Sequence, residues 1–203
     1  MNYSLLLQKL KRPEKDILNV YCYGSRVYGN ITDKSDYDFI VIVKEKMCEQ
    51  FSDNQINVNF FTEEEHQKRL DLHEISALEC HFLPENFIWK EKIHFSFDLD
   101  LNKLRHALSQ KSSNSWVKAK KKLTIPQDFD ENMGKKSLFH SFRIIHYGIQ
   151  IATENRISDY ACCNSLFYEI MYHYGDWQSL FETYKQNYNA LLTEFRKVAP
   201  KTV

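Results

Sequence analysis

The chain has 203 residues, of which 43% are hydrophobic and 27% charged, a composition typical of a folded protein and not of a disordered one. Five glycines and four prolines are too few for a collagen-like or linker-rich sequence. No apolar run approaches the roughly 20 residues of a bilayer-spanning helix, and the first residues are too charged for a secretory signal. We therefore expect a soluble cytoplasmic protein with no membrane partner.

The formal net charge is zero, but the charge is unevenly distributed along the chain. Residues 1–100 hold 12 basic and 18 acidic side chains, whereas residues 101–203 hold 15 and 9. Such an asymmetry suits a site that joins metal ions to a phosphorylated substrate, and two ordinary solvated surfaces would produce it as well. The five cysteines include no CxxC pair and the eight histidines no HExxH spacing, so we expect reduced thiols and neither a disulfide framework nor a zinc ribbon.

Short β-like runs alternate with helical patterns in the first half. The expected elements are a helix at 4–10, strands at 18–23, 37–43 and 56–61, a helix from 62 to about 83, and a strand within 87–97. The run from Tyr37 to Val43 is nearly continuous in apolar residues, which is typical of a central strand buried on both faces. Thr62 and Glu65 form a capping box that starts the second helix.

The second half is helical. Apolar residues at three- and four-residue spacing predict helices at 99–108, 116–123, 135–154, 161–173 and 177–198, with breaks at 112–114, at 125–127 and near Gly175. The predicted fold class is α+β, in which a small mixed β-sheet with flanking helices (residues 1–98) precedes a helical domain (residues 99–203).

The most informative stretch is YGSRVYGNITDKSDYDFIV, which begins at Tyr23. Gly24 follows a strand, and because it lacks a Cβ it lets a phosphate approach the backbone closely. Ser25 lies at the start of a short helix, where its hydroxyl and the free N–H groups can bind an anion. We therefore predict that Gly24 and Ser25 bind nucleotide phosphates.

Asp36 and Asp38 lie two residues apart at the head of the central strand, so their side chains point to the same face. Two neighbouring carboxylates are unfavourable unless a cation neutralises them. Mg²⁺ or Mn²⁺ ions that bridge triphosphate oxygens are the usual solution. The sequence therefore predicts that Asp36 and Asp38 hold metal and are catalytic.

A GS turn followed by a DxD strand resembles the signature of the nucleotidyltransferase superfamily typified by DNA polymerase β. Gly24–Gly29 with Ser35–Asp38 looks closest in wording to the predicted nucleotidyltransferases associated with RNA repair. The resemblance implies a nucleotidyltransferase-like fold and a metal-dependent enzyme that binds ATP or another NTP. Such an enzyme moves a nucleoside monophosphate to an acceptor hydroxyl on RNA, a protein or a small molecule and releases pyrophosphate. Arg26 would then assist with the triphosphate charge.

One departure from the superfamily concerns a third carboxylate, which is normally placed on a neighbouring strand. The strand predicted at 56–61 carries Asn57 and Asn59 instead, and an amide cannot act as a general base. Asp53, Glu63 and Glu79 are possible substitutes that the sequence does not place. The alternative hypothesis is therefore a catalytically silent module that binds nucleotide or a partner.

The basic second half contains further candidate phosphate contacts. Lys136, His140 and Arg143 are spaced so that they share one helical face, and helical cations of related nucleotidyltransferases bind the triphosphate. We accordingly predict that Lys136 and Arg143 bind nucleotide, with a solvated helical face as the alternative. The run of lysines from 118 to 122 beside Trp116 suits a nucleic-acid backbone or, again, a solvated face. The oligomeric state stays open.

Overall fold

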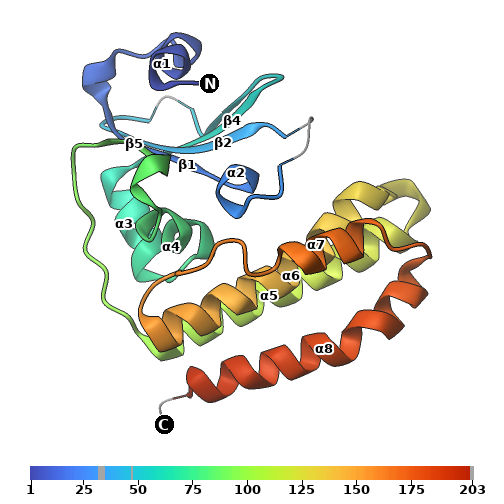
Figure 1. The fold of residues 1–203 in the computed structure, drawn as a ribbon. Helices are drawn as coiled ribbons and strands as arrows, with labels where there is room; N and C mark the ends of the chain where they lie inside the picture. The colour runs from blue at the N-terminus through green and yellow to red at the C-terminus, as the bar shows by residue number, and fades with distance from the viewer. Residues whose placement is uncertain (32–34, 47, 202–203) are drawn as a thin grey trace. The chain divides into compact units, whose positions relative to one another are not determined.

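The computed structural model describes residues 1–31, 35–46 and 48–201 and divides into two compact units, Met1–Asp98 and Leu99–Val203 (Figure 1). The first unit contains α1 (Tyr3–Leu10), η1 (Glu14–Asp16), β1 (Ile17–Tyr23), α2 (Ser25–Tyr28), β2 (Tyr37–Val43), β3 (Gln50–Ser52), β4 (Ile56–Thr62), α3 (Glu63–Asp71), α4 (Ile75–His81), η2 (Glu85–Phe87) and β5 (Ile88–Glu91). The second contains α5 (Leu101–Thr124), η3 (Pro126–Asp128), α6 (Glu131–Glu154), α7 (Asn164–Met171) and α8 (Trp177–Val198). No helix in these described ranges combines the length and apolar character that a bilayer span requires.

The five strands form one mixed sheet in the order β3-β4-β2-β1-β5. β2 lies at the centre, antiparallel to β1 and parallel to β4. Its last five residues are fully buried, as the uninterrupted apolar run predicts. The predicted fold class, a small mixed sheet with flanking helices and a helical C-terminal region, is confirmed.

The two faces of the sheet have different neighbours. On one face, alternate residues of the strands pack against Leu6 and Leu10 of α1 and form the main apolar core of the unit. The other face carries α2, α3 and α4 (Figure 1). Because side chains alternate along a strand, the register that pairs Asp38 with both Tyr23 and Asn57 brings these three to the latter face.

The helix expected from 62 to about 83 is two helices, and the prediction of one continuous element was wrong. α3 starts at the capping box that the sequence indicates, with Thr62 Oγ1 accepting from the Glu65 amide and the Glu65 carboxylate accepting from the Thr62 amide. It ends at Asp71, and His73 then adopts a positive φ of 56° before α4 begins. This left-handed residue turns the chain, so a capping signal alone did not define where the helix stops.

The break expected at 112–114 is also absent, since α5 runs without interruption from Leu101 to Thr124. Ser112 is buried, and its hydroxyl donates to the Ser141 carbonyl at 2.7 Å and lies 2.7 Å from the Tyr188 hydroxyl. Ser112 therefore hydrogen-bonds to α6 and α8. Its hydroxyl is satisfied within the helical unit, so no loop is needed at this point.

Glycines allow close packing in the helical unit. A Cβ on Gly134 would meet the Leu123 side chain, and one on Gly148 would meet Leu108 and Phe195. Leu108 near the start of α5 thus lies beside Gly148 late in α6, and Leu123 at the end of α5 lies beside Gly134 early in α6. The two helices therefore run antiparallel. The unit is therefore a helical hairpin to which α8 adds a third long helix.

Beneath the sheet face that carries α3, His66 is buried with its ring stacked on Tyr21 and edge-on to Phe95. No described residue hydrogen-bonds to His66 Nδ1. Burial lowers the pKa of His66 to about 4, and the positive charge of Arg69 and the neighbouring His81 add to this effect. The neutral imidazole is thus the form that the fold accommodates.

We expect the fold to lose stability as the pH falls from 6.5 towards 4, because the unfolded chain takes up a proton at His66 that the folded chain excludes. The full loss from this residue, reached near pH 4, is about 3 kcal/mol in the free energy of unfolding, of which about 2 kcal/mol falls between pH 7 and pH 5. Urea unfolding of the wild type and of His66→Phe at pH 7 and pH 5 measures it. The variant should show a smaller decrease, and equal decreases in both proteins would contradict this assignment.

Candidate functional site

The turn between β1 and β2 is built around two glycines. Gly24 has φ 81° and ψ −152°, a conformation that only glycine adopts readily, and it precedes the four-residue helix α2. Gly29 ends that helix with φ 78°. A Cβ added to Gly24 would collide with the Asp38 carboxylate, whose Cγ would lie only 3.1 Å away. The Gly24 backbone therefore lies directly against Asp38.

We expect Gly24→Ala to destabilise the protein by about 2 kcal/mol or more, because it combines a strained positive φ with a clash against Asp38. Gly29→Ala is the matched control, since Gly29 also has a positive φ. Urea unfolding of both variants separates the positive φ, which they share, from the ψ of −152° and the displacement of Asp38, which concern Gly24 alone. Equal losses in the two variants would show that the contact with Asp38 contributes nothing.

Asp36 and Asp38 lie on either side of the first residue of β2, and the structure brings them together with Asn57 of β4. Asn57 Nδ2 donates to Asp36 Oδ2 at 3.2 Å and to Asp38 Oδ1 at 3.3 Å. The two acceptor oxygens are consequently no further apart than the sum of these lengths, 6.5 Å. One amide group thus bridges both carboxylates.

The orientation of Asn57 is fixed from its other side. Ser52 Oγ donates to Asn57 Oδ1 at 2.7 Å, which leaves the amide NH₂ pointing at the carboxylates. Ser52 is the last residue of the short strand β3, which pairs Ser52 with Asn57 across the ladder. Sequence analysis missed β3 and therefore Ser52, because three residues give too short a pattern to show alternation.

Tyr23 and Asn59 are two further polar residues on the sheet face that carries Asp38 and Asn57. Asn59 Nδ2 donates to the Tyr23 hydroxyl at 3.3 Å. Burial and the negative charge of Asp38 raise the pKa of Tyr23 far above its ordinary value. Tyr23 is therefore a neutral phenol at physiological pH and not a base.

Arg26 connects the turn to the carboxylate strand. Its guanidinium donates to the Ser35 carbonyl at 2.9 Å and stacks on Tyr37, with the guanidinium carbon 3.5 Å from the ring centroid. These contacts fix α2 against the segment that precedes Asp36. Thr32–Lys34 of the same motif lie outside the described residues.

The donor set fits a magnesium or manganese ion. Mg²⁺ prefers oxygen ligands and is commonly held by one or two carboxylates together with substrate phosphates. Asp36 and Asp38 supply two carboxylates on one face, and Asn57 adds an amide whose oxygen now accepts from Ser52. In the described part of the chain, no cluster of three or more His, Cys, Asp or Glu side chains forms a metal site. Substrate oxygens would have to complete the coordination.

The three acidic residues considered as substitutes for a third carboxylate make contacts elsewhere in the first unit. Asp53 pairs with Lys9 at 2.5 Å, and its side chain accepts from the Gln55 and Ile56 amides in the β3–β4 turn. Glu79 is buried in α4 and accepts from the Tyr28 hydroxyl at 2.9 Å. Both carboxylates thus have structural partners.

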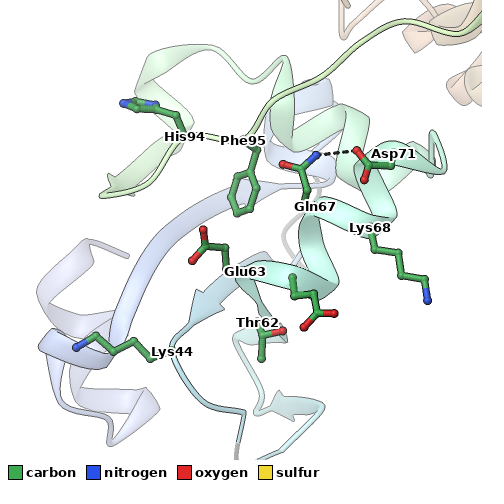
Figure 2. A pocket seen from close by; sticks show the side chains of 9 residues that line it. Lys44, Thr62, Glu63, Gln67, Lys68, Asp71, His94 and Phe95 are labelled. Carbon is green, nitrogen blue, oxygen red and sulfur yellow. Dashed lines mark hydrogen bonds between the residues drawn. The ribbon is translucent and has the colours of Figure 1, made fainter.

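The third, Glu63, lines an open cavity of about 670 Å³ together with Lys44, Thr62 and Lys68 (Figure 2). Thr62 and Asn57 are five residues apart on β4, which corresponds to roughly 17 Å along an extended strand. The cavity therefore lies at the opposite end of β4 from the carboxylate pair. Glu63 does not reach that pair.

The candidate cations of the second half lie on α5 and α6. Lys136 is exposed, whereas Arg143 is buried beside Phe139 and Tyr147. Their predicted role in nucleotide binding stays a prediction. Trp116 stacks on Tyr188 with ring centroids 4.4 Å apart, so its ring packs within the helical unit.

Comparison with known proteins finds one family model that matches most of the first unit. A family model described as a nucleotidyltransferase domain matches residues 4–95. A search of curated proteins finds no match.

Two solved structures are similar to this chain. One is a spectinomycin adenyltransferase, AAD(9), from Enterococcus faecialis, solved with ATP and spectinomycin, at 12% identity and a TM-score of 0.49 over 97% of this chain and 100% of that one. The other is a nucleotidyltransferase-like protein from Exiguobacterium sibiricum, at 10% identity and a TM-score of 0.33 over 97% and 72%. Both TM-scores lie below 0.5, so neither structure supports a conclusion about this chain.

Proposed function

Residues 4–95 belong to the nucleotidyltransferase superfamily, and on this premise we propose that the protein moves a nucleoside monophosphate from an NTP to an acceptor hydroxyl and releases pyrophosphate. The observation that carries the proposal is the carboxylate pair, Asp36 and Asp38, set directly against the glycine turn at Gly24. In such a site a phosphate that approaches Gly24 comes next to both carboxylates. The binding of substrate phosphate and the binding of a cation are therefore coupled, because both take place at the same group of residues.

Each residue of the site has a role in the proposal. Asp36 and Asp38 hold Mg²⁺ or Mn²⁺, which when bound neutralises phosphate charge and favours attack at the α-phosphorus. Gly24 and Ser25 bind the phosphates through the backbone and the serine hydroxyl. Arg26 contributes its positive charge from the stack on Tyr37. Residues 1–98 would be the catalytic domain and residues 99–203 a helical domain.

The acceptor is RNA, a protein or a small molecule. The glycine turn and the carboxylate pair recognise phosphate and metal, which all NTPs share, so base and acceptor selection must come from other surfaces. For the same reason the proposal covers ATP and the other three NTPs equally.

A second function is supported by Asn57. Its amide occupies the strand position on β4 opposite Asp38, where a third carboxylate would complete an acidic triad. It brings no negative charge and accepts no proton from an acceptor hydroxyl. The alternative is therefore a module that binds NTP and metal, or a partner, without transfer.

Transfer of α-labelled ATP, CTP, GTP and UTP in the presence of Mg²⁺ or Mn²⁺ tests the proposal. The purified protein is assayed alone, with a pool of tRNA and short RNAs, and with a cell-derived small-molecule fraction. Label that appears on one of these acceptors only when the metal is present supports transfer and identifies the acceptor class. NTP binding that depends on metal, with no label on any acceptor, would favour the silent module.

A further inference from the structure

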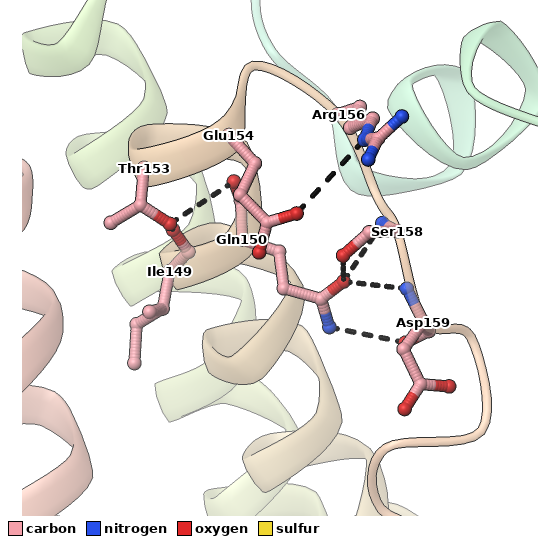
Figure 3. Close-up of polar contacts among 7 residues, drawn as sticks. All are labelled: Ile149, Gln150, Thr153, Glu154, Arg156, Ser158 and Asp159. Carbon is pink, nitrogen blue, oxygen red and sulfur yellow. Dashed lines mark hydrogen bonds and ion pairs between the residues drawn. The ribbon is translucent and has the colours of Figure 1, made fainter.

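The segment between α6 and α7, residues 155–163, is held to α6 by Tyr147, whose hydroxyl donates to the Tyr160 carbonyl at 2.7 Å, and by Gln150 (Figure 3). Gln150 Oε1 accepts from the Ser158 amide at 2.9 Å, the Ser158 hydroxyl at 3.0 Å and the Asp159 amide at 2.8 Å. Its Nε2 donates to the Asp159 carbonyl at 3.1 Å and to Cys162 Sγ at 3.4 Å. The position of Cys162 is therefore defined by this network.

Cys162 and Cys163 are adjacent in the sequence, and their sulfur atoms lie 3.5 Å apart just before α7. Cys162 is exposed and Cys163 is buried. A reagent in solution can thus reach the Cys162 thiol directly, and the buried Cys163 thiol lies next to it. The remaining exposed cysteine, Cys48, lies in the other unit.

The surroundings favour a thiolate on Cys162. The hydrogen bond from Cys163 lowers the pKa of Cys162, and the Gln150 amide and the Arg143 charge act in the same direction. Burial and the Asp159 carboxylate oppose them without reversing the result. The same hydrogen bond raises the pKa of Cys163, so Cys163 stays a thiol that donates to Cys162.

The sulfur separation is better suited to bridging by one atom than to a disulfide. Disulfides usually join Cα atoms about 4.4–6.8 Å apart, whereas consecutive residues are about 3.8 Å apart across a trans peptide. Two thiolates bound at about 2.3 Å to one tetrahedral centre would be separated by about 3.8 Å, and by somewhat less at a trivalent pyramidal centre, whose bond angles are narrower. The observed 3.5 Å is close to that value.

We propose that Cys162 and Cys163 form a chelating dithiol site for a soft trivalent centre, of the class represented by an organic arsenoxide, R–As=O. In the reaction both S–H bonds and the As=O bond break, two As–S bonds form, and the two thiol protons leave with the oxygen as water, so that nothing is oxidised or reduced. Soft thiolates select soft centres. Because no triad of ligating side chains is present among the described residues, the site suits a centre that brings its own third substituent.

The test is to add phenylarsine oxide to the reduced full-length protein in excess 2-mercaptoethanol and to count adducts by native mass spectrometry. The monothiol competes away arsenic held by a single cysteine and leaves a chelate intact. We expect one adduct on the wild type and on Cys48→Ser, and binding at least about tenfold weaker in Cys162→Ser, because one sulfur loses the effective concentration of its neighbour. Cys163→Ala should behave like Cys162→Ser.

Cys162→Ser changes an exposed side chain, so its result does not depend on how the buried Cys163 site tolerates substitution. An arsenical adduct that persists in Cys162→Ser, or that disappears in Cys48→Ser, would overturn the proposal, as would a wild type that takes up no adduct. A parallel titration with Zn²⁺ tests the class of ligand. Stoichiometric zinc binding that requires Cys162 and Cys163 would replace the trivalent centre with a four-coordinate metal.

Discussion

We expect the double variant Asp36→Ala/Asp38→Ala to lose nucleotidyl transfer by at least about a thousandfold, because the two carboxylates hold metal as one unit and neither replaces the other. Their shared contact with the Asn57 amide supports this joint action, since one donor spans both oxygens. Asp36→Asn and Asp38→Asn, which keep the shape and remove the charge, should each produce most of the loss. The measurement is label transfer from the NTP that the wild type uses.

The stability of the double variant separates a chemical effect from a structural one. Removal of two neighbouring like charges offsets the loss of the hydrogen bonds from Asn57, so the free energy of unfolding should change by no more than about 1 kcal/mol. Asp71→Asn is the control, because Asp71 is an exposed carboxylate of the same unit that accepts a hydrogen bond from Gln67 Nε2 at 2.7 Å (Figure 2). Full activity in the double variant, or an equal loss in Asp71→Asn, would refute the assigned roles.

The central features of the sheet could be predicted because they depend on local patterns. β2 was predicted with its observed bounds, since its last five residues form an uninterrupted apolar run, which is typical of a strand with both faces covered. The short α2 and the same-face placement of Asp36 and Asp38 follow from the glycines and from strand alternation. In each of these places the local sequence and the tertiary environment favour the same structure.

The features that were missed depend on contacts between distant residues. Ser52 reaches the site only because β3 pairs with β4, and nothing in three residues indicates such a pairing. The continuity of α5 through Ser112 depends on the Ser141 carbonyl of another helix. The division between α3 and α4 depends on a single left-handed residue, His73, and positive φ is too uncommon in non-glycine residues for the sequence to indicate it.

The second large effect concerns Asn57→Asp, which we expect to strengthen binding of Mn²⁺ or Mg²⁺ by about tenfold or more, because it adds a third carboxylate to the pair. In the absence of metal the same change replaces two donated hydrogen bonds with charge repulsion, and the free energy of unfolding should fall by about 1–2 kcal/mol. Metal titrations by calorimetry and thermal melts with and without Mn²⁺ measure both effects. Neither readout requires the protein to be an active enzyme.

Asn59→Asp is the matched control, since it adds the same charge to the same face of β4 but contacts Tyr23 instead of the carboxylate pair. Equal gains in metal affinity from Asn57→Asp and Asn59→Asp would mean that general charge, not the position of residue 57, sets the affinity. No gain from Asn57→Asp would mean that metal does not bind at the pair. Transfer activity that appears only in Asn57→Asp would identify the wild type as the silent module.

Ser52→Ala tests whether Ser52 keeps the amide oxygen of Asn57 away from a cation bound at the carboxylate pair. The Ser52 hydroxyl holds Asn57 Oδ1 away from the carboxylates, so the amide presents hydrogens where a cation would need oxygen. Loss of that hydroxyl allows the amide to turn its oxygen toward a cation, and we expect a gain in metal affinity smaller than that of Asn57→Asp. In the Asn57→Asp background the hydroxyl donates to a carboxylate in either orientation, so Ser52→Ala should then produce no gain. A gain of the same size in both backgrounds would show that Ser52 does not act through residue 57.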